Sequence, residues 1–188
     1  ELYTRWVQFG VFSPILRLHS TKNPYHERRP WGFDAQVFEI ARRALQFRHA
    51  LIPYLYSMAW RNHTASLPLI TPMYYPHPQS PDAYDAPHQY WFGSELIAAT
   101  FTSPMEADTR LAKQALWLPE GDWFDFFTGE YTPGGGWRTV HGSLSETPLF
   151  ARSGAIVPLG PLVGWSGVDN PAELTLVFFP GADNRFEL

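Results

Sequence analysis

The chain has 188 residues, which corresponds to one domain of ordinary size or two small ones. Apolar residues make up 45% and charged residues 17%, so the chain can bury a sizeable core and is not disordered. Fourteen basic against eighteen acidic side chains give a net charge of −4, which argues against a general nucleic-acid-binding protein, because such a protein needs a basic face for phosphates.

Membrane spans and cysteine chemistry are also excluded by the composition. No apolar stretch approaches the length of about 20 residues that a membrane-spanning helix needs. The chain has no cysteine, which rules out disulfides, thiolate metal sites and cysteine nucleophiles but leaves cytoplasmic and secreted locations equally open. Eighteen prolines, fourteen glycines and 16% aromatic residues indicate many turns around short strands.

The first predicted element is a helix over residues 1–12, in which apolar residues recur at spacings of three and four. Pro14 ends it, because proline cannot continue a helix. The apolar run over residues 15–19 is typical of a short buried strand that carries a polar residue, His19, at its end. A polar loop over residues 20–32 follows.

The strongest predicted helix begins after Asp34, a good N-cap residue, and continues to about Arg61. Its apolar positions keep helical spacing throughout. Pro53 lies inside the pattern and predicts a kink, because it lacks the amide hydrogen and clashes with the preceding turn.

The rest of the chain has the pattern of β structure. Residues 67–75 are expected to be extended, and a loop rich in proline and aspartate follows through Pro87. Short apolar runs then alternate with turns, at residues 95–101, 114–118, 123–127, 137–140, 147–151 and 155–157, and a further strand begins at Leu174. Closely spaced strands with such turns favour an antiparallel sandwich.

Most of the residues that commonly carry enzyme chemistry show no catalytic pattern. The seven histidines include no pair at the i, i+4 spacing of a zinc-binding helix, so no protein-ligated metal site is predicted. Asp122 and Asp125 are expected on opposite faces of a strand, and Asp82 and Asp85 in a loop where aspartate commonly caps its own turn. The glycine-rich residues 133–137 indicate a hairpin loop, since no helix follows them to cradle a phosphate.

His19 is the remaining candidate. On spacing alone, a histidine that ends a short apolar strand is usually a structural residue. A strand end that opens onto a long polar loop is, however, where α/β barrels place their site residues. The pattern therefore leaves both roles open.

Four separated stretches of the chain carry a resemblance to a known family. Residues 2–19 closely resemble the late barrel segment of glycoside hydrolase family 31, the α-glucosidase and α-xylosidase family. Residues 43–56 are similar to that family's last barrel helix, including its internal proline. Residues 116–129 and 148–158 are similar to two signatures of its first C-terminal β domain.

The resemblance implies the fold class α/β plus all-β: the last strand and helices of a (β/α)₈ TIM barrel, an antiparallel β-sandwich, and the start of a further β domain. Residues 1–78 would be the C-terminal segment of the catalytic barrel, residues 79–160 the proximal sandwich and residues 161–188 the start of a distal domain. The family's enzymes are retaining α-glycosidases whose two catalytic aspartates lie on earlier barrel strands. This chain is therefore expected to contain no catalytic residue and to be inactive without the rest of the barrel.

One site residue follows from the resemblance. His19 matches the histidine that hydrogen-bonds a hydroxyl of the sugar in the −1 subsite, a task that suits neutral imidazole because it donates from one nitrogen and accepts at the other. Arg17, two residues earlier on the same side of the strand, is expected to orient neighbouring carboxylates. The expected partner is an α-glucoside, α-xyloside or related oligosaccharide, with no cofactor, metal, nucleic acid or membrane. The sequence does not decide between hydrolase, transglycosylase and lyase outcomes.

An alternative interpretation is a non-catalytic module. A carbohydrate-binding β domain would need exposed aromatic rings, for which Trp137, Trp165 and Tyr131 are the candidates because they lie near turns. A third possibility is a structural domain that supports the barrel, which is compatible with the first interpretation. The burial of these three rings distinguishes the carbohydrate-binding alternative from the other two.

Overall fold

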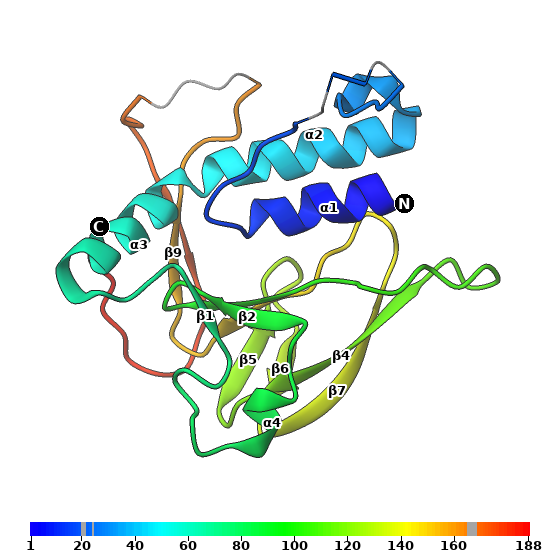
Figure 1. Cartoon of the computed structure of the whole chain (residues 1–188). Coiled ribbons are helices and arrows are strands. Elements are labelled where there is room, and N and C mark those ends of the chain that lie inside the picture. Colours follow the sequence, from blue (N-terminus) through cyan, green and yellow to red (C-terminus); the bar gives the residue numbers. More distant parts are fainter. Residues whose placement is uncertain (20–21, 24, 165–168) are drawn as a thin grey trace.

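The computed structural model describes residues 1–19, 22–23, 25–164 and 169–188. Helices α1 (Leu2–Val11), α2 (Ala35–Ala50) and α3 (Ile52–Ala65) form a layer above a body of short strands (Figure 1). A single 3₁₀ turn, η1 (Pro30–Gly32), precedes α2, and a short helix, α4 (Pro81–Tyr84), lies at the opposite end of the strands. No helix within the described residues is long and apolar enough to cross a membrane.

The helices begin where local signals place them, with one correction. The Asp34 carboxylate accepts a hydrogen bond from the Val37 amide at 2.8 Å, which makes it the N-cap of α2 as predicted. The expected single kinked helix is instead two helices, separated at Leu51. Pro53 lies in the first turn of α3, where a missing amide hydrogen costs no helical hydrogen bond, so the proline starts a helix rather than bending one.

Residues 15–19 do not form the expected buried strand. Their backbone has no regular structure, and Ile15 is 83% exposed. A buried barrel strand needs a hydrogen-bonded neighbour on each side, and no strand of the described residues pairs with this segment. Just before this segment, the Arg48 guanidinium donates to the carbonyl oxygens of Val11 and Pro14 at 2.8 and 3.0 Å. Leu16 of the segment is half-buried and lies against Gly10 of α1.

The strands form the predicted antiparallel sandwich. The larger sheet has six strands in the order β1-β2-β3-β8-β5-β6, and it faces a sheet of two strands, β4 and β7; β9 and β10 form another pair. The bounds are β1 Ile70–Pro72, β2 Gln89–Phe92, β3 Leu96–Ala99, β4 Ala112–Leu118, β5 Asp122–Asp125, β6 Tyr131–Pro133, β7 Gly136–Gly142, β8 Leu149–Arg152, β9 Ile156–Leu159 and β10 Thr175–Phe178.

Two hydrophobic cores hold these layers together. The first lies between the helices and the six-stranded sheet and includes Phe12, Leu51, Tyr54, Phe92 and Leu149. The second lies inside the sandwich and includes Ile97, Leu116, Leu118, Trp123 and Phe150. The first core contains residues from both sides of position 78, so the helices and the sandwich pack as one body.

The C-terminal residues pack on the same body. β10 pairs antiparallel with β9, and Phe179, which follows β10, is buried in the first core. The Phe186 ring stacks on the Tyr54 ring with centroids 5.8 Å apart. The domain limits at residues 78 and 160 are predictions that these contacts leave open.

Candidate functional site

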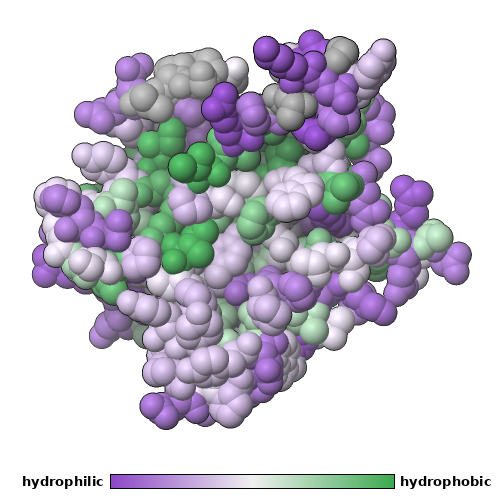
Figure 2. All heavy atoms as spheres, in the orientation of Figure 1, coloured by the Kyte–Doolittle hydropathy of each residue, from purple (hydrophilic) through white to green (hydrophobic). Residues whose placement is uncertain are grey.

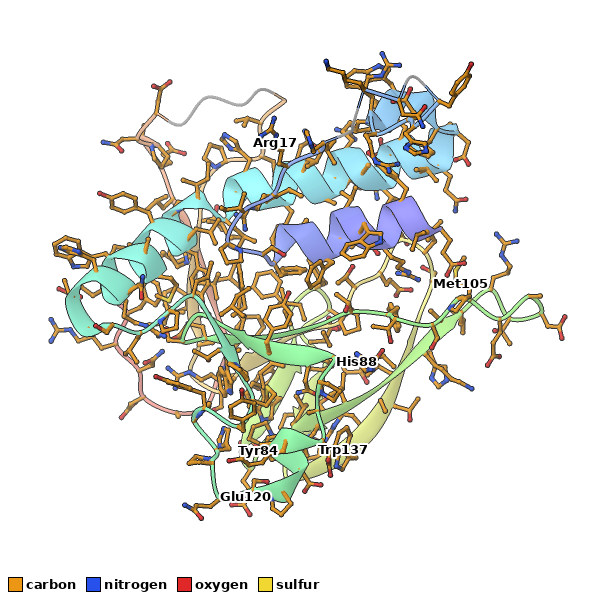
Figure 3. All side chains as sticks on the ribbon, viewed as in Figure 1. Arg17, Tyr84, His88, Met105, Glu120 and Trp137 are labelled. Atoms are coloured by element: carbon orange, nitrogen blue, oxygen red, sulfur yellow. The ribbon has the colours of Figure 1, made fainter. Side chains whose placement is uncertain are left out.

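The two predicted sugar-binding residues lie on the irregular segment that follows α1. His19 and Arg17 are both exposed. Figure 3 shows Arg17 at the edge of the molecule, where this segment passes α2. Arg17 and His19 were expected on the same side of a strand, but residues 15–19 form no strand in this structure. Their roles in sugar binding stay predictions.

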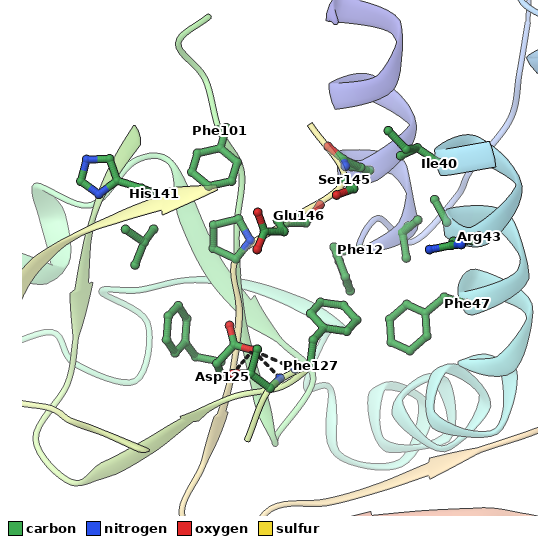
Figure 4. Close-up of a pocket in the computed structure, with 18 of the residues that line it drawn as sticks. Phe12, Ile40, Arg43, Phe47, Phe101, Asp125, Phe127, His141, Ser145 and Glu146 are labelled. Carbon is green, nitrogen blue, oxygen red and sulfur yellow. Dashed lines mark hydrogen bonds between the residues drawn. The ribbon is translucent and has the colours of Figure 1, made fainter. Parts of the chain in front are cut away.

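Three of the four aspartates in the strand and loop pairs accept hydrogen bonds. Asp125 Oδ1 accepts hydrogen bonds from the Phe127 and Thr128 amides at 2.9 and 2.8 Å and so caps the turn after β5 (Figure 4). Asp122 accepts from the Tyr131 hydroxyl at 2.8 Å. Asp82 was expected to cap its own turn, but its carboxylate accepts instead from the indole nitrogen of Trp137 at 2.7 Å. None of these carboxylates forms an acid/base couple with another.

A cavity of about 1040 Å³ lies between the helices and part of the sandwich (Figure 4). Phe12 and Phe47 on the helix side and Phe101 and Phe127 on the sandwich side give it aromatic walls. Neither His19 nor Arg17 lines it. The sequence did not indicate this cavity, because its walls come from segments far apart along the chain.

Several charged groups that line this cavity make local contacts. Arg43 on α2 donates to Glu39 at 2.7 Å. Glu146 accepts from the Ser143 amide at 2.7 Å, and this hydrogen bond holds the pKa of the Glu146 carboxyl below its usual value. Asp125 caps its turn, so it, Glu39 and Glu146 are all engaged in local hydrogen bonds. The cavity lies at the interface between the helices and the sandwich, and His141 is also part of its wall (Figure 4).

Arg5 fixes the position of α1 on the sandwich. Its guanidinium donates to the carbonyl oxygens of Ser143 and Glu146 at 3.1 and 2.9 Å and lies over the Phe101 ring, 4.7 Å from the centroid. Burial lowers the pKa of Arg5. One turn later, the Gln8 amide donates to the Leu144 carbonyl at 2.8 Å. These contacts set where the segment with Arg17 and His19 leaves α1.

Metal ligands do not gather at any of these places. Across residues 1–19, 22–23, 25–164 and 169–188, no group of three or more histidine, aspartate or glutamate side chains could hold a metal ion.

Comparison with known proteins establishes the family: the chain belongs to glycoside hydrolase family 31. Residues 1–58 match the family's TIM-barrel domain and residues 66–157 match its C-terminal domain. The first match covers α1, α2, about half of α3 and the segment with His19, and the second covers the sandwich into β9. The fold class expected from the sequence is confirmed.

Individual relatives agree along nearly the whole chain. An α-xylosidase of Saccharolobus solfataricus is 33% identical over 100% of this chain and 25% of its own length, and the neutral α-glucosidase C of Mus musculus is 33% identical over 93% of this chain and 19% of its own. The solved structure of a family 31 dextranase of Flavobacterium johnsoniae, a variant complexed with isomaltotriose, superposes with a TM-score of 0.85 and 30% identity, covering 98% of this chain and 22% of that one. This chain spans about a quarter or less of the length of these relatives.

Proposed function

We propose that this chain is the C-terminal part of a retaining α-glycosidase that acts on α-glucosides, α-xylosides or related oligosaccharides. In this proposal, residues 1–78 complete a catalytic barrel and residues 79–160 form the sandwich that supports it. The matches of residues 1–58 to the family's barrel domain and of residues 66–157 to its C-terminal domain support this assignment. The names of the relatives, an α-xylosidase and an α-glucosidase, support the substrate class.

His19 binds a sugar hydroxyl in the proposed enzyme, and its exposed position is the observation that carries this role. The segment before it presents Ile15, 83% exposed, and Leu18, 38% exposed, to solvent. Neighbouring barrel strands would cover these apolar side chains and turn the segment into the last strand, with His19 at its open end. A neutral imidazole there can donate to one sugar hydroxyl and accept from another. Arg17 is proposed to orient neighbouring carboxylates.

The proposal places both reacting carboxylates in barrel strands that precede this segment. A retaining glycosidase needs a nucleophile and a general acid/base about 5–5.5 Å apart on either side of the glycosidic bond. His19 would hold the sugar ring while it distorts toward an oxocarbenium-like transition state. The 188-residue chain is accordingly proposed to be inactive by itself.

The test replaces His19 by alanine in the full-length enzyme that contains this chain. Loss of a hydrogen bond that acts on the transition state should lower kcat/KM for 4-nitrophenyl α-glucoside or α-xyloside at least tenfold, which corresponds to about 1.4 kcal/mol. His88→Ala is the matched control, because His88 is also an exposed histidine but lies directly before β2 in the sandwich, away from Arg17 (Figure 3). A His19→Ala enzyme that is as stable and as active as the His88→Ala enzyme would remove His19 from the site.

The alternative, a carbohydrate-binding module, depends on exposed rings in the sandwich. Tyr131 is 55% and Trp137 43% exposed, so neither is sealed in a core, and Trp165 lies outside the described residues. The family match favours a catalytic role for the longer protein. The exposed rings support a second sugar-binding surface rather than a replacement for the catalytic one.

A further inference from the structure

Three partly exposed aromatic side chains lie at the end of the sandwich where α4 lies. Tyr74, Tyr84 and Trp137 are 43%, 56% and 43% exposed, and we call them, with Asp82, the α4 aromatic surface. Figure 3 shows Tyr84 and Trp137 together at the bottom of the view, and Figure 1 shows α1 and α2 at the opposite end. The residues that match the barrel domain are therefore remote from this surface.

The rings of this surface are fixed in place. Tyr74 and Tyr84 stack with their centroids 5.0 Å apart and their planes within 7° of each other. The Tyr84 hydroxyl donates to the Pro78 carbonyl at 3.1 Å, and the Trp137 indole donates to Asp82 at 2.7 Å. Because the free protein already holds these rings, a ligand loses little side-chain entropy when it stacks on them.

Trp137 is more exposed than its cross-strand neighbour, Trp117. It pairs with Trp117 across the β4–β7 ladder, so both indoles are on the same face of that sheet. The loop before α4 covers Trp117, which is 5% exposed, and the His77 ring meets it edge-on at 5.6 Å. Trp137 lies beyond that cover, at the border of the loop. Its exposed part does not contribute to the core and is free to contact a ligand.

The chemistry of the surface favours an uncharged ligand rich in hydroxyl groups. Asp82 is the acidic residue of this surface, Asp85 directly follows α4, and Figure 3 shows Glu120 at the same end of the molecule as Tyr84. The chain as a whole carries a net charge of −4. These charges disfavour phosphates and anionic lipids. In Figure 2 the lower part of the molecule is mostly pale, of intermediate hydropathy, without the strong green of the apolar patch above it. Aromatic faces beside a carboxylate suit a sugar, whose C–H face packs on a ring while its hydroxyls donate to the carboxylate.

We propose that the α4 aromatic surface is a second carbohydrate-binding site that holds a chain of α-linked glucose residues. Pyranose rings stack on Trp137 and on the open side of Tyr84, and Asp82 accepts a hydrogen bond from a hydroxyl between them. The choice of α-linked glucose rests on the proposed function; the binding of sugar by these rings does not. Such a site would keep a polymeric substrate on the enzyme between cleavage events.

The experiment measures the retardation of the full-length enzyme in native gels that contain dextran or soluble starch. Trp137→Ala and Tyr84→Ala should each weaken the retardation at least fivefold, while Trp137→Phe, which keeps a ring, should retain most of it. Hydrolysis of 4-nitrophenyl α-glucoside should stay within twofold of the unaltered enzyme. Tyr56→Ala is the matched control, because Tyr56 is 76% exposed but lies on α3.

The outcomes separate this proposal from the proposed function. The site is supported if either polymer retards the enzyme and this retardation is lost in Trp137→Ala but kept in Tyr56→Ala. Both variants must keep the melting temperature of the unaltered enzyme. This result supports the site even if the enzyme hydrolyses no glycoside. An active enzyme that neither polymer retards, or that is retarded equally with and without Trp137, overturns the site and leaves the proposed function intact. Association of the enzyme with itself through this surface, without retardation, also overturns it.

Discussion

At the scale of the residue, His77 lies between the rings of two tryptophans. Its ring lies nearly parallel to the Trp91 indole, with centroids 6.2 Å apart, and edge-on to Trp117 at 5.6 Å. Burial lowers the pKa of His77 below its ordinary value of 6.5. The unfolded chain, where this pKa is not lowered, therefore binds more protons than the folded chain at pH values just below 6.5.

This difference predicts that His77 makes the protein less stable in mild acid. The free energy of unfolding rises with pH wherever the unfolded state holds more protons, so the contribution of His77 is lost as the pH falls through 6.5. Replacing His77 by phenylalanine should reduce the difference in melting temperature between pH 7.5 and pH 5.5. His88→Phe, at an exposed position, should leave that difference unchanged. An equal pH dependence in all three proteins would contradict the prediction.

At the scale of the element, one buried carboxylate joins three strands and the tail of the chain. Glu95, 1% exposed, accepts from the Arg152 guanidinium at 3.0 Å, from the Ile156 amide at 3.1 Å and from the Asn184 side chain at 2.8 Å. Arg152 also donates to Asn184 at 3.1 Å. Glu95 directly precedes β3, and its partners belong to β8, β9 and the residues after β10.

Removal of this carboxylate should loosen all of these elements together. Glu95→Ala leaves a partly buried guanidinium and two donors without their acceptor, so we expect it to lower the free energy of unfolding by about 3 kcal/mol. Urea unfolding followed by circular dichroism measures the loss. Glu39→Ala, which breaks exposed ion pairs with Arg42 and Arg43 on α2, is the comparison and should change stability little. The prediction is wrong if both variants unfold at the same urea concentration.

The elements also show what the sequence alone could predict. α1, the start of α2 and most strands follow from local signals: apolar spacing, the Asp34 cap, and turns between apolar runs. Pro53 is compatible with either a kink or a new helix, and the packing of Leu51 in the first core decides between them. β2 and β6 were not predicted, because they are short and lie beside loops rich in proline or glycine.

The candidate site was even less predictable from local sequence signals. A β-strand is stabilised by hydrogen bonds to a neighbouring strand. The apolar pattern of residues 15–19 therefore cannot form a strand without the neighbouring strands of a barrel. His19 and Arg17 were found through the family resemblance and not through their surroundings. The cavity between α2 and the sandwich and the contact of Asp82 with Trp137 depend on distant segments. No local pattern in the sequence encodes such contacts.

At the scale of the whole molecule, the helices and the sandwich form one body with one uncovered side. Arg5 and Gln8 bind the loop before β8, and the Tyr90 hydroxyl donates to the Phe12 carbonyl at 2.9 Å, so α1 is held on the sandwich from several directions. Leu2 and Trp6 on α1 are nevertheless 74% and 63% exposed, and Ile15, in the apolar segment after α1, is 83% exposed. Exposed apolar area of this extent is typical of a surface that another part of a protein covers.

The same arrangement predicts that the chain folds without being active. The contacts above can form within the 188 residues, whereas the retaining mechanism needs two free carboxylates about 5–5.5 Å apart, and Asp122, Asp125 and Glu146 are occupied by local hydrogen bonds. The purified chain should show a cooperative melting transition and no release of 4-nitrophenol from its α-glucoside or α-xyloside. The full-length enzyme at equal molarity is the positive control. Release that rises in proportion to the concentration of the isolated chain, and that disappears in its His19→Ala variant, would place the reacting carboxylates within this chain and overturn the division of the site proposed here.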